Sequence, residues 1–577
     1  MSFRVETNVR IPMRDGVTLA ADVYIPDGGP VPALVVRLPY GKNNTSALGI
    51  AVNPDIHTLL EAGYAVVRQD CRGTFASGGR FTPLADEPKD GVDTIAWVRE
   101  QAWCNGTVGS YGPSYLGWTQ WACGSQSPDG LKAMAPAMTT PDLYQAWHTP
   151  GGAVSWHNFI FWNTYMALSE AQRALSGGTG DPQAVTELTE AIVNLDQSLE
   201  LMPAEQKLLA KYVPWWSEWL QHPHRDDFWA QLSPADQLSA VTVPALHIGG
   251  WFDLWAGETA RSYTRMKAEA GTAAAREGQR LIMGPWNHLD QSGVYHDRQF
   301  GLTSDAFVMN ITGAYVSFFD RWLRGQLDAL EGTAPVRIFV MGIDQWRDEP
   351  DWPLPDTNYV DYFLHGAGWA NTSTGDGVLR TDPPSESAAD TYVYDPNRPV
   401  PSLGGRIMLP AALNAVGPVN QEPVEARDDV LCFTTPELDE SIEVTGHVSL
   451  VVYVMSSARD TDFIGKLVDV APDGRATYLT DGILRARYRY SLADPELLEP
   501  GQVYELSLDL AVTSNVFLPG HRIRLEISSS SFPRYDRNTN TGGNINQESL
   551  EDAVIATNKI LHGPEHPSRL ILPIISR

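Results

Sequence analysis

Residues 107–117 read Thr-Val-Gly-Ser-Tyr-Gly-Pro-Ser-Tyr-Leu-Gly, a short strand-like run that gives way to a helix-like stretch. A serine on such a strand-to-helix turn, here Ser114, is a candidate nucleophile, because the turn lifts its hydroxyl above the end of the sheet. Gly112 permits the sharp bend. The strict motif has glycine two residues after the serine, where this chain has Leu116 and then Gly117. Taken alone, the segment fits a nucleophile turn or an ordinary glycine-serine turn.

Two more reactive residues follow downstream, each just beyond another apolar strand-like run. The run 243–248 leads to Asp253, and the run 281–283 leads to His288. The order serine, acid, histidine is the order of α/β-hydrolases. Because the carboxyl ends of parallel strands share one edge of a sheet, residues remote in sequence can meet there. Each residue alone fits a turn or loop role, but together they predict a Ser-His-Asp triad.

Length and composition fit a large enzyme with several domains. The chain has 577 residues, 43% of them hydrophobic, and 18 tryptophans that could serve core packing or an aromatic pocket. The net charge of −28 argues against binding to nucleic acid or to an anionic membrane surface, since both would repel it. We therefore expect neither as a partner.

Cysteine spacing and apolar runs bear on metals and on location. The four cysteines form no CxxC pair and have no histidine at zinc-like spacing, so neither a metal site nor a disulfide framework is predicted. The start of the chain lacks an apolar core of signal-peptide length, and there is no uninterrupted run of about 18 apolar residues. These features favour a cytoplasmic protein that does not span a membrane.

The sequence pattern divides the chain into four segments. Strand-like and helix-like runs alternate over 1–143 and again over 241–350, which predicts one α/β-hydrolase domain in two parts. Helical runs dominate 144–240 and predict an inserted cap domain that could act as a lid. Alternating runs with proline-rich and glycine-rich connections over 351–577 predict a C-terminal β-sandwich domain of jelly-roll type.

Several motifs together carry a specific resemblance. The chain resembles the cocaine esterase family of serine hydrolases, which is related to X-Pro dipeptidyl peptidases and α-amino acid ester hydrolases. The resemblance runs nearly end to end and rests on Gly-x-Ser-Tyr-x-Gly at 112–117, Arg-Leu-Pro-Tyr at 37–40, Gln-Asp-Cys-Arg-Gly-Thr at 69–74, the acid and histidine loops, 515–522 and 532–536.

The resemblance implies roles for five residues. Ser114 would be the nucleophile, His288 the general base and then acid, and Asp253 the group that orients the imidazole. The Tyr40 hydroxyl and the backbone N–H of Tyr115 would form the oxyanion hole. The resemblance further implies a small-molecule ester as substrate, no cofactor, no metal, and a homodimer as one possible assembly.

The resemblance also implies a substrate pocket for the acyl group. Its walls would be Trp147, Trp162, Trp255, Met408 and Leu409. Aromatic walls suit an aryl acyl group of benzoyl type. Trp255 stands where the family has a smaller aromatic residue, the pair at 408–409 replaces a leucine and a phenylalanine, and the segment after Tyr40 diverges from the family.

Two other functions are open on the sequence alone. The chain could be an α-amino acid ester hydrolase or an X-Pro dipeptidyl peptidase, which must bind a substrate ammonium with carboxylates. It could also be a non-catalytic ligand-binding protein that keeps the hydrolase fold, since fold alone does not prove activity.

Overall fold

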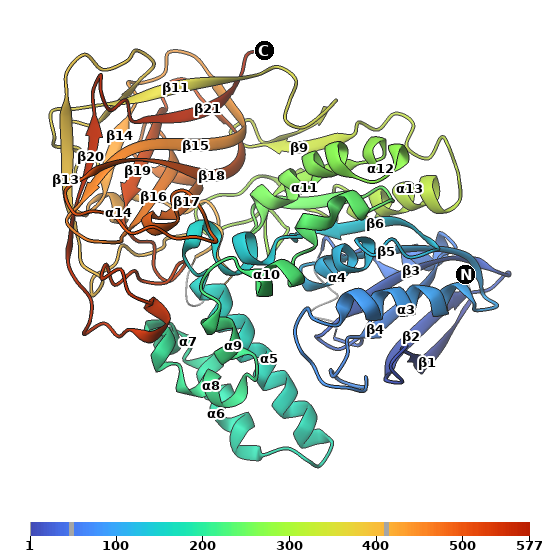
Figure 1. Ribbon diagram of the computed structural model, residues 1–577. Helices are drawn as coiled ribbons and strands as arrows, with labels where there is room; N and C mark the ends of the chain where they lie inside the picture. The colour runs from blue at the N-terminus through green and yellow to red at the C-terminus, as the bar shows by residue number, and fades with distance from the viewer. Residues whose placement is uncertain (1, 45–50, 409–414) are drawn as a thin grey trace.

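The computed structural model describes residues 2–44, 51–408 and 415–577 and has three regions (Figure 1). An α/β region is built from both the first part of the chain and the segment that follows the helical insertion. The inserted helices project from it, and a sheet-rich region formed by the last third of the chain lies beside both. The domain boundaries at 143, 240 and 350 stay predictions.

The α/β region is organised around one ten-stranded sheet. Its strand order is β1-β2-β4-β3-β5-β6-β7-β8-β9-β10, parallel from β4 to β9 and antiparallel toward both edges. The strands are β1 (Phe3–Pro12), β2 (Thr18–Pro26), β3 (Val31–Leu38), β4 (Ala65–Asp70), β5 (Cys104–Pro113), β6 (Leu131–Ala137), β7 (Leu246–Phe252), β8 (Arg280–Asn287), β9 (Val336–Val340) and β10 (Gln345–Glu349).

Helices cover both faces of this sheet, which explains why its central strands are apolar throughout. In β3, Ala33 and Val35 belong to the core beneath α3, α4 and α11, while Leu34 and Val36 belong to the core beneath α2 and α13. The helices are α2 (Ile56–Glu61), α3 (Glu87–Arg99), α4 (Tyr115–Gly124), α11 (Ala256–Glu269), α12 (Ala273–Glu277) and α13 (Ile311–Leu323).

The inserted region is helical, and its longest helix, α5, contacts the α/β region through Trp162, whose indole N–H donates to the Tyr40 hydroxyl. A one-turn π-helix, Leu143–His148, precedes it. The helices are α5 (Trp156–Ser176), α6 (Pro182–Val193), α7 (Leu195–Glu200), α8 (Lys207–Tyr212), α9 (Trp216–Gln221) and α10 (Asp227–Leu232).

The C-terminal region is rich in strands. Eleven of them are hydrogen-bonded into one sheet, whose apolar core is continuous with buried residues of β7, β8, β9 and α11 in the α/β region. They are β11 (Thr357–His365), β12 (Val378–Arg380), β13 (Ala388–Tyr394), β14 (Leu431–Thr434), β15 (Ile442–Ser456), β16 (Asp462–Val470), β17 (Ala476–Arg485), β18 (Val503–Phe517), β19 (Arg522–Ser528), β20 (Ala556–His562) and β21 (Arg569–Ile575), with the one-turn helix α14 (Glu422–Glu425) between β13 and β14. The predicted fold class, mixed α/β with a sheet-rich C-terminal region, is confirmed.

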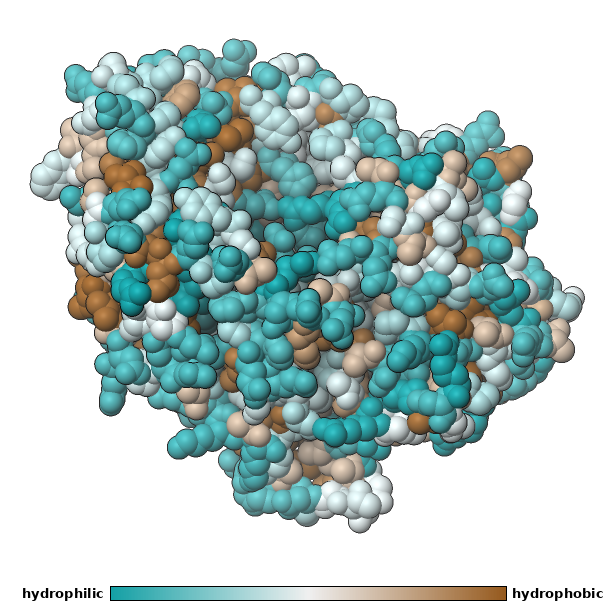
Figure 2. All heavy atoms as spheres, in the orientation of Figure 1, coloured by the Kyte–Doolittle hydropathy of each residue, from teal (hydrophilic) through white to brown (hydrophobic). Residues whose placement is uncertain are grey.

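The surface agrees with the acidic composition. The face in Figure 2 is covered mainly by hydrophilic residues, with apolar atoms in scattered groups. In the described ranges, no helix combines the length and the apolar character that crossing a bilayer requires.

Candidate active site

Ser114 lies on a strained turn between β5 and α4. Its backbone has φ 60° and ψ −128°, a left-handed region that a residue with a Cβ seldom adopts. The turn is held by two contacts: the Ser114 N–H donates to the carbonyl oxygen of Ala137 at 3.0 Å, and Thr139 Oγ1 donates to the Ser114 carbonyl at 2.8 Å. These bonds fix the hydroxyl at the carboxyl edge of the sheet, as a nucleophile turn requires.

The two glycines of the motif are required by close contacts. Gly112 has φ 130°, and a Cβ there would come within 2.7 Å of the Leu116 Cβ. A Cβ on Gly117 would come within 2.6 Å of Thr139 Cγ2. The second glycine of the motif is thus needed at 117, where α4 passes the segment that follows β6. Position 116 holds leucine in the same turn.

The structure brings the three predicted catalytic residues together in hydrogen-bonding order. Ser114 follows β5, Asp253 follows β7 and His288 follows β8. His288 Nε2 lies 3.0 Å from Ser114 Oγ, and His288 Nδ1 lies 2.6 Å from Asp253 Oδ2. Asp253 is fully buried, and its other oxygen accepts the backbone N–H of Trp255 at 2.8 Å. The carboxylate is therefore fixed against the imidazole and can select its tautomer.

Tyr40 lies beside the nucleophile and carries a hydroxyl that can donate a hydrogen bond. The Tyr40 oxygen accepts the indole N–H of Trp162 at 3.0 Å. Burial raises the pKa of the Tyr40 hydroxyl above its ordinary value, and interactions with Trp162 and Ser114 act in the opposite direction. Because the pKa is raised, the hydroxyl stays protonated and able to donate at neutral pH.

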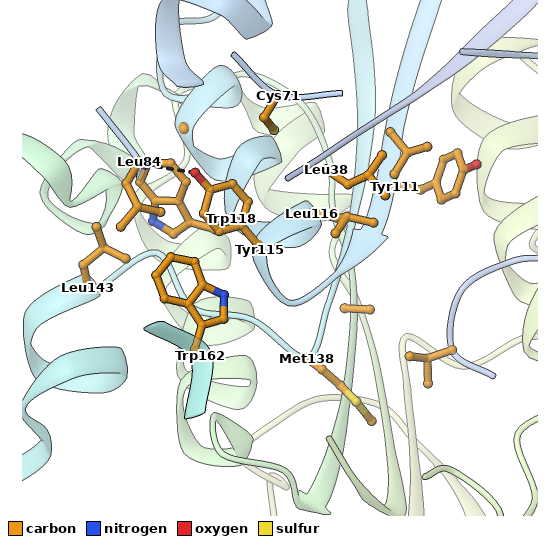
Figure 3. Close-up of a cluster of buried hydrophobic side chains, with 14 of the residues drawn as sticks. Leu38, Cys71, Leu84, Tyr111, Tyr115, Leu116, Trp118, Met138, Leu143 and Trp162 are labelled. Carbon is orange, nitrogen blue, oxygen red and sulfur yellow. Dashed lines mark hydrogen bonds between the residues drawn. The ribbon is translucent and has the colours of Figure 1, made fainter. Parts of the chain in front are cut away.

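Tyr115 is the first residue of α4, where a backbone N–H has no acceptor inside the helix. Its side chain is anchored: the hydroxyl donates to Glu87 Oε1 at 3.1 Å and accepts the Leu84 N–H at 2.9 Å. Figure 3 shows the Tyr115 and Trp162 side chains close together, and their rings stack with centroids 6.3 Å apart. The anchored ring holds the N–H in place next to Ser114.

A cavity of about 280 Å³ opens beside Ser114. The described residues that line it include one histidine, His288, and no aspartate, glutamate, lysine or arginine. The lining residues are Tyr40, Leu84, Pro113, Ser114, Tyr115, Leu116, Trp118, Thr139, Thr140, Leu143, Trp147, Asn158, Phe161, Trp162, Tyr165, Trp255, His288, Leu289 and Met408.

The pocket residues that the sequence predicted lie in this lining, with one exception. Trp147, Trp162, Trp255 and Met408 all line the cavity, while Leu409 lies outside the described residues. Trp147 meets Trp162 edge-on at 5.1 Å between ring centroids. Trp255 meets the imidazole of His288 edge-on at 5.0 Å, so it packs against the base as well as the cavity.

Three cavity residues of α5 are not among those predicted from the sequence. They are Asn158, Phe161 and Tyr165. Counted from Asn158 as position i, Phe161 is i+3, Trp162 is i+4 and Tyr165 is i+7. These spacings place all four on one face of a helix. Once Trp162 was assigned to the pocket, helical periodicity alone could have found the other three.

Metal ligation has no candidate in the part of the chain that the structure describes. No group of three or more histidine, cysteine, aspartate or glutamate side chains is placed to hold an ion. The four cysteines are buried and unpaired with one another.

The fold and the site together define a serine hydrolase. Residues 15–290 match the family model described as X-Pro dipeptidyl-peptidase (S15 family), and residues 328–571 match that of the X-Pro dipeptidyl-peptidase C-terminal non-catalytic domain. The chain is 47% identical to cocaine esterase of Rhodococcus sp. (strain MB1 Bresler), over 100% of this chain and 99% of that protein. The chain belongs to this family of serine ester hydrolases.

Two solved structures are also similar along the whole chain. An aminopeptidase from a marine sediment archaeon (Thaumarchaeota archaeon) has a TM-score of 0.81 at 26% identity, covering 100% of this chain and 96% of its own. An α-amino acid ester hydrolase has a TM-score of 0.79 at 25% identity, covering 99% and 96%. The match to a serine esterase along the whole chain supports an enzyme over the non-catalytic alternative.

Proposed function

We propose that this chain hydrolyses aryl esters of benzoyl type, with Ser114 as nucleophile, His288 as base and then acid, and Asp253 as the orienting carboxylate. The observation that carries the proposal is the hydrogen-bonded order of these residues at the mouth of an aromatic cavity. The name of the 47% identical relative, cocaine esterase, supports an ester substrate. The cavity supports an aryl acyl group, because ring faces and edges pack well against one another.

Acylation begins when His288 Nε2 takes the proton of Ser114 Oγ as that oxygen attacks the ester carbonyl. The imidazole is kept in the productive orientation by its second nitrogen, which donates to Asp253. Negative charge then develops on the carbonyl oxygen. The Tyr40 hydroxyl and the Tyr115 N–H are the two donors next to Ser114 that can stabilise it.

Collapse of the tetrahedral intermediate releases the alcohol, which leaves with the proton from His288. The acyl group stays on Ser114 and its aryl ring lies in the cavity, against Trp162 and Trp147. Water is then deprotonated by His288 and attacks the same carbonyl, releasing the acid and restoring the serine. Proton transfer, attack and charge stabilisation are all supplied by side chains and backbone groups of this chain.

Hydrolysis of α-amino acid esters or X-Pro peptides is the second candidate, favoured by the names of the S15 family and of the α-amino acid ester hydrolase structure. Both substrates carry an ammonium, which binds best to carboxylates. The described residues of the catalytic cavity include no aspartate or glutamate. The adjoining cavity has Glu258 and Asp509, but both are paired with Arg261, which favours the aryl ester.

The experiment that separates the two candidates compares three substrates at equal concentration. They are a benzoate ester, an α-amino acid ester and an X-Pro arylamide. We expect the highest kcat/KM for the benzoate ester and loss of that activity in Ser114→Ala. Higher kcat/KM for either ammonium-bearing substrate would reject the aryl-ester proposal and support the alternative.

Cytoplasmic location and a homodimer stay predictions from the sequence. The acidic net charge of −28 and the buried, unpaired cysteines support the first. Size-exclusion chromatography with light scattering tests the second.

A further inference from the structure

The Asn158 amide is a buried polar group in the wall of the catalytic cavity with an unpaired oxygen. The residue lies in the first turn of α5 and is 2% exposed. Within the described ranges, its Oδ1 has no hydrogen-bond partner. Burying an amide oxygen without a partner costs about 1–3 kcal/mol, so native proteins rarely leave one unpaired unless a ligand or water completes it.

Several other polar side chains of the cavity already have a hydrogen-bond partner. Thr139 Oγ1 donates to the Ser114 carbonyl, Thr140 Oγ1 donates to the Asp142 carbonyl at 3.2 Å, and Tyr40 accepts from the Trp162 indole. The Trp118 indole N–H is also unpaired, but it is only a donor. Asn158 is thus a lining side chain away from the triad whose amide carries N–H donors and an oxygen that has no partner within the described ranges.

The position of Asn158 on α5 relates it to a bound acyl group. Asn158 and Trp162 lie four residues apart, one helical turn, or about 6 Å along the axis. Trp162 is hydrogen-bonded to Tyr40 beside the nucleophile. Asn158 and Trp255 also line a second, more polar cavity of about 320 Å³, so the amide marks the boundary between the two. Asn158 and Trp162 both line the catalytic cavity, so a ring bound against Trp162 shares that cavity with the amide.

We propose that Asn158 is a subsite for a hydroxyl group on the aryl acyl part of the substrate, so that a hydroxybenzoate ester is preferred over the plain benzoate ester. A hydroxyl both donates and accepts, as the amide does. A charged substituent that stays within the catalytic cavity fits less well, because the described residues of that cavity include no aspartate, glutamate, lysine or arginine. This inference rests on the proposed aryl esterase function.

The test compares methyl benzoate with its three hydroxy isomers on the native enzyme and on Asn158→Leu. We expect at least one isomer to exceed benzoate about tenfold in kcat/KM, the worth of one neutral hydrogen bond. In Asn158→Leu this advantage should disappear. Because the electronic effect of the hydroxyl on the ester is the same for both enzymes, it cancels when the two isomer-to-benzoate ratios are compared.

Asn163 on the same helix provides the matched control. It is also buried, but its amide donates to the Phe159 carbonyl at 2.8 Å and accepts the Trp215 indole N–H at 2.7 Å. Asn163→Leu should lower the unfolding midpoint and leave the substrate ratio unchanged, whereas Asn158→Leu should change the ratio without lowering the midpoint.

Three results would overturn the subsite. The first is an isomer-to-benzoate ratio of kcat/KM that Asn158→Leu leaves unchanged, and the second is the absence of a preferred isomer in the native enzyme. The third is a lower unfolding midpoint of Asn158→Leu with equal losses of activity on all four esters, which would mean that the amide serves structure or holds only water. In each case Ser114-dependent hydrolysis of benzoate would leave the proposed function standing. If none of the four esters is hydrolysed, the function itself fails and the subsite with it.

Discussion

Replacing Tyr40 with phenylalanine tests the oxyanion hole directly. The variant keeps the ring and removes only the hydroxyl that lies beside Ser114. The second donor, the Tyr115 N–H at the start of α4, is backbone and is unaffected. We therefore expect the loss of one donor, about 10²–10³ in kcat, or roughly 2.7–4 kcal/mol of transition-state stabilisation.

The loss should fall on kcat and not on KM. The hydroxyl meets a neutral carbonyl in the ground state and an oxyanion in the transition state, so its hydrogen bond strengthens only as the reaction proceeds. Stopped-flow or steady-state rates on a benzoate ester give both constants. The Trp162 N–H loses its acceptor in the variant, so circular dichroism and the unfolding midpoint should accompany the kinetics.

Tyr64 supplies a matched control for Tyr40. It is buried in the α/β region, and its hydroxyl donates to Asp320 at 2.6 Å, away from the cavity. Tyr64→Phe also deletes one hydrogen-bonded hydroxyl, so it should lower stability and leave kcat nearly unchanged. Our reasoning is refuted if Tyr40→Phe keeps kcat within about threefold of native, or if it raises KM at constant kcat.

Two further predictions concern stability. Gly117→Ala should destabilise the fold by about 1–3 kcal/mol and reduce activity, since the new Cβ would lie 2.6 Å from Thr139 Cγ2. Denaturant unfolding measures the loss of stability. Gly177→Ala is the control and should have a small effect, because the nearest atom to its new Cβ is 3.5 Å away. Burial, with neighbouring Glu526, raises the pKa of Glu425 to about 7, so the folded state binds its proton more tightly than the unfolded state and stability falls as pH rises from about 4.5 to 7. Between pH 5 and 7.5, Glu425→Gln should reduce the fall in the free energy of unfolding, measured with urea, by about 1–3 kcal/mol. The same fall in the native protein and in the variant would contradict this prediction.

The sequence was sufficient to predict the places of Ser114, Asp253 and His288 on the sheet. Each follows a parallel strand, and strand order alone brings such ends to one edge. The sequence shows a glycine at 117 but not why it is needed. A Cβ at this position of α4 would clash with Thr139, which lies just after β6. Local pattern does not contain such contacts.

The cavity was harder to predict because it forms between remote segments. Tyr40 follows β3 and Trp162 lies in α5, yet the indole N–H of one reaches the hydroxyl of the other. Only the family resemblance connected them. Asn158 lacked even that signal, since an asparagine in the first turn of a helix is an ordinary residue there, and its unpaired oxygen is visible only in three dimensions.

The most direct measurement is the covalent intermediate itself. A benzoate ester with a good leaving group is mixed with the enzyme, the reaction is quenched with acid in the first turnover, and the protein is analysed by intact mass and peptide mapping. We predict a mass increase of one benzoyl group on the peptide that contains Ser114, and neither adduct nor turnover in folded Ser114→Ala, whose kcat should fall by about 10⁶. A benzoyl adduct on another residue, or turnover by Ser114→Ala near the native rate, would contradict the assignment of Ser114 as the nucleophile.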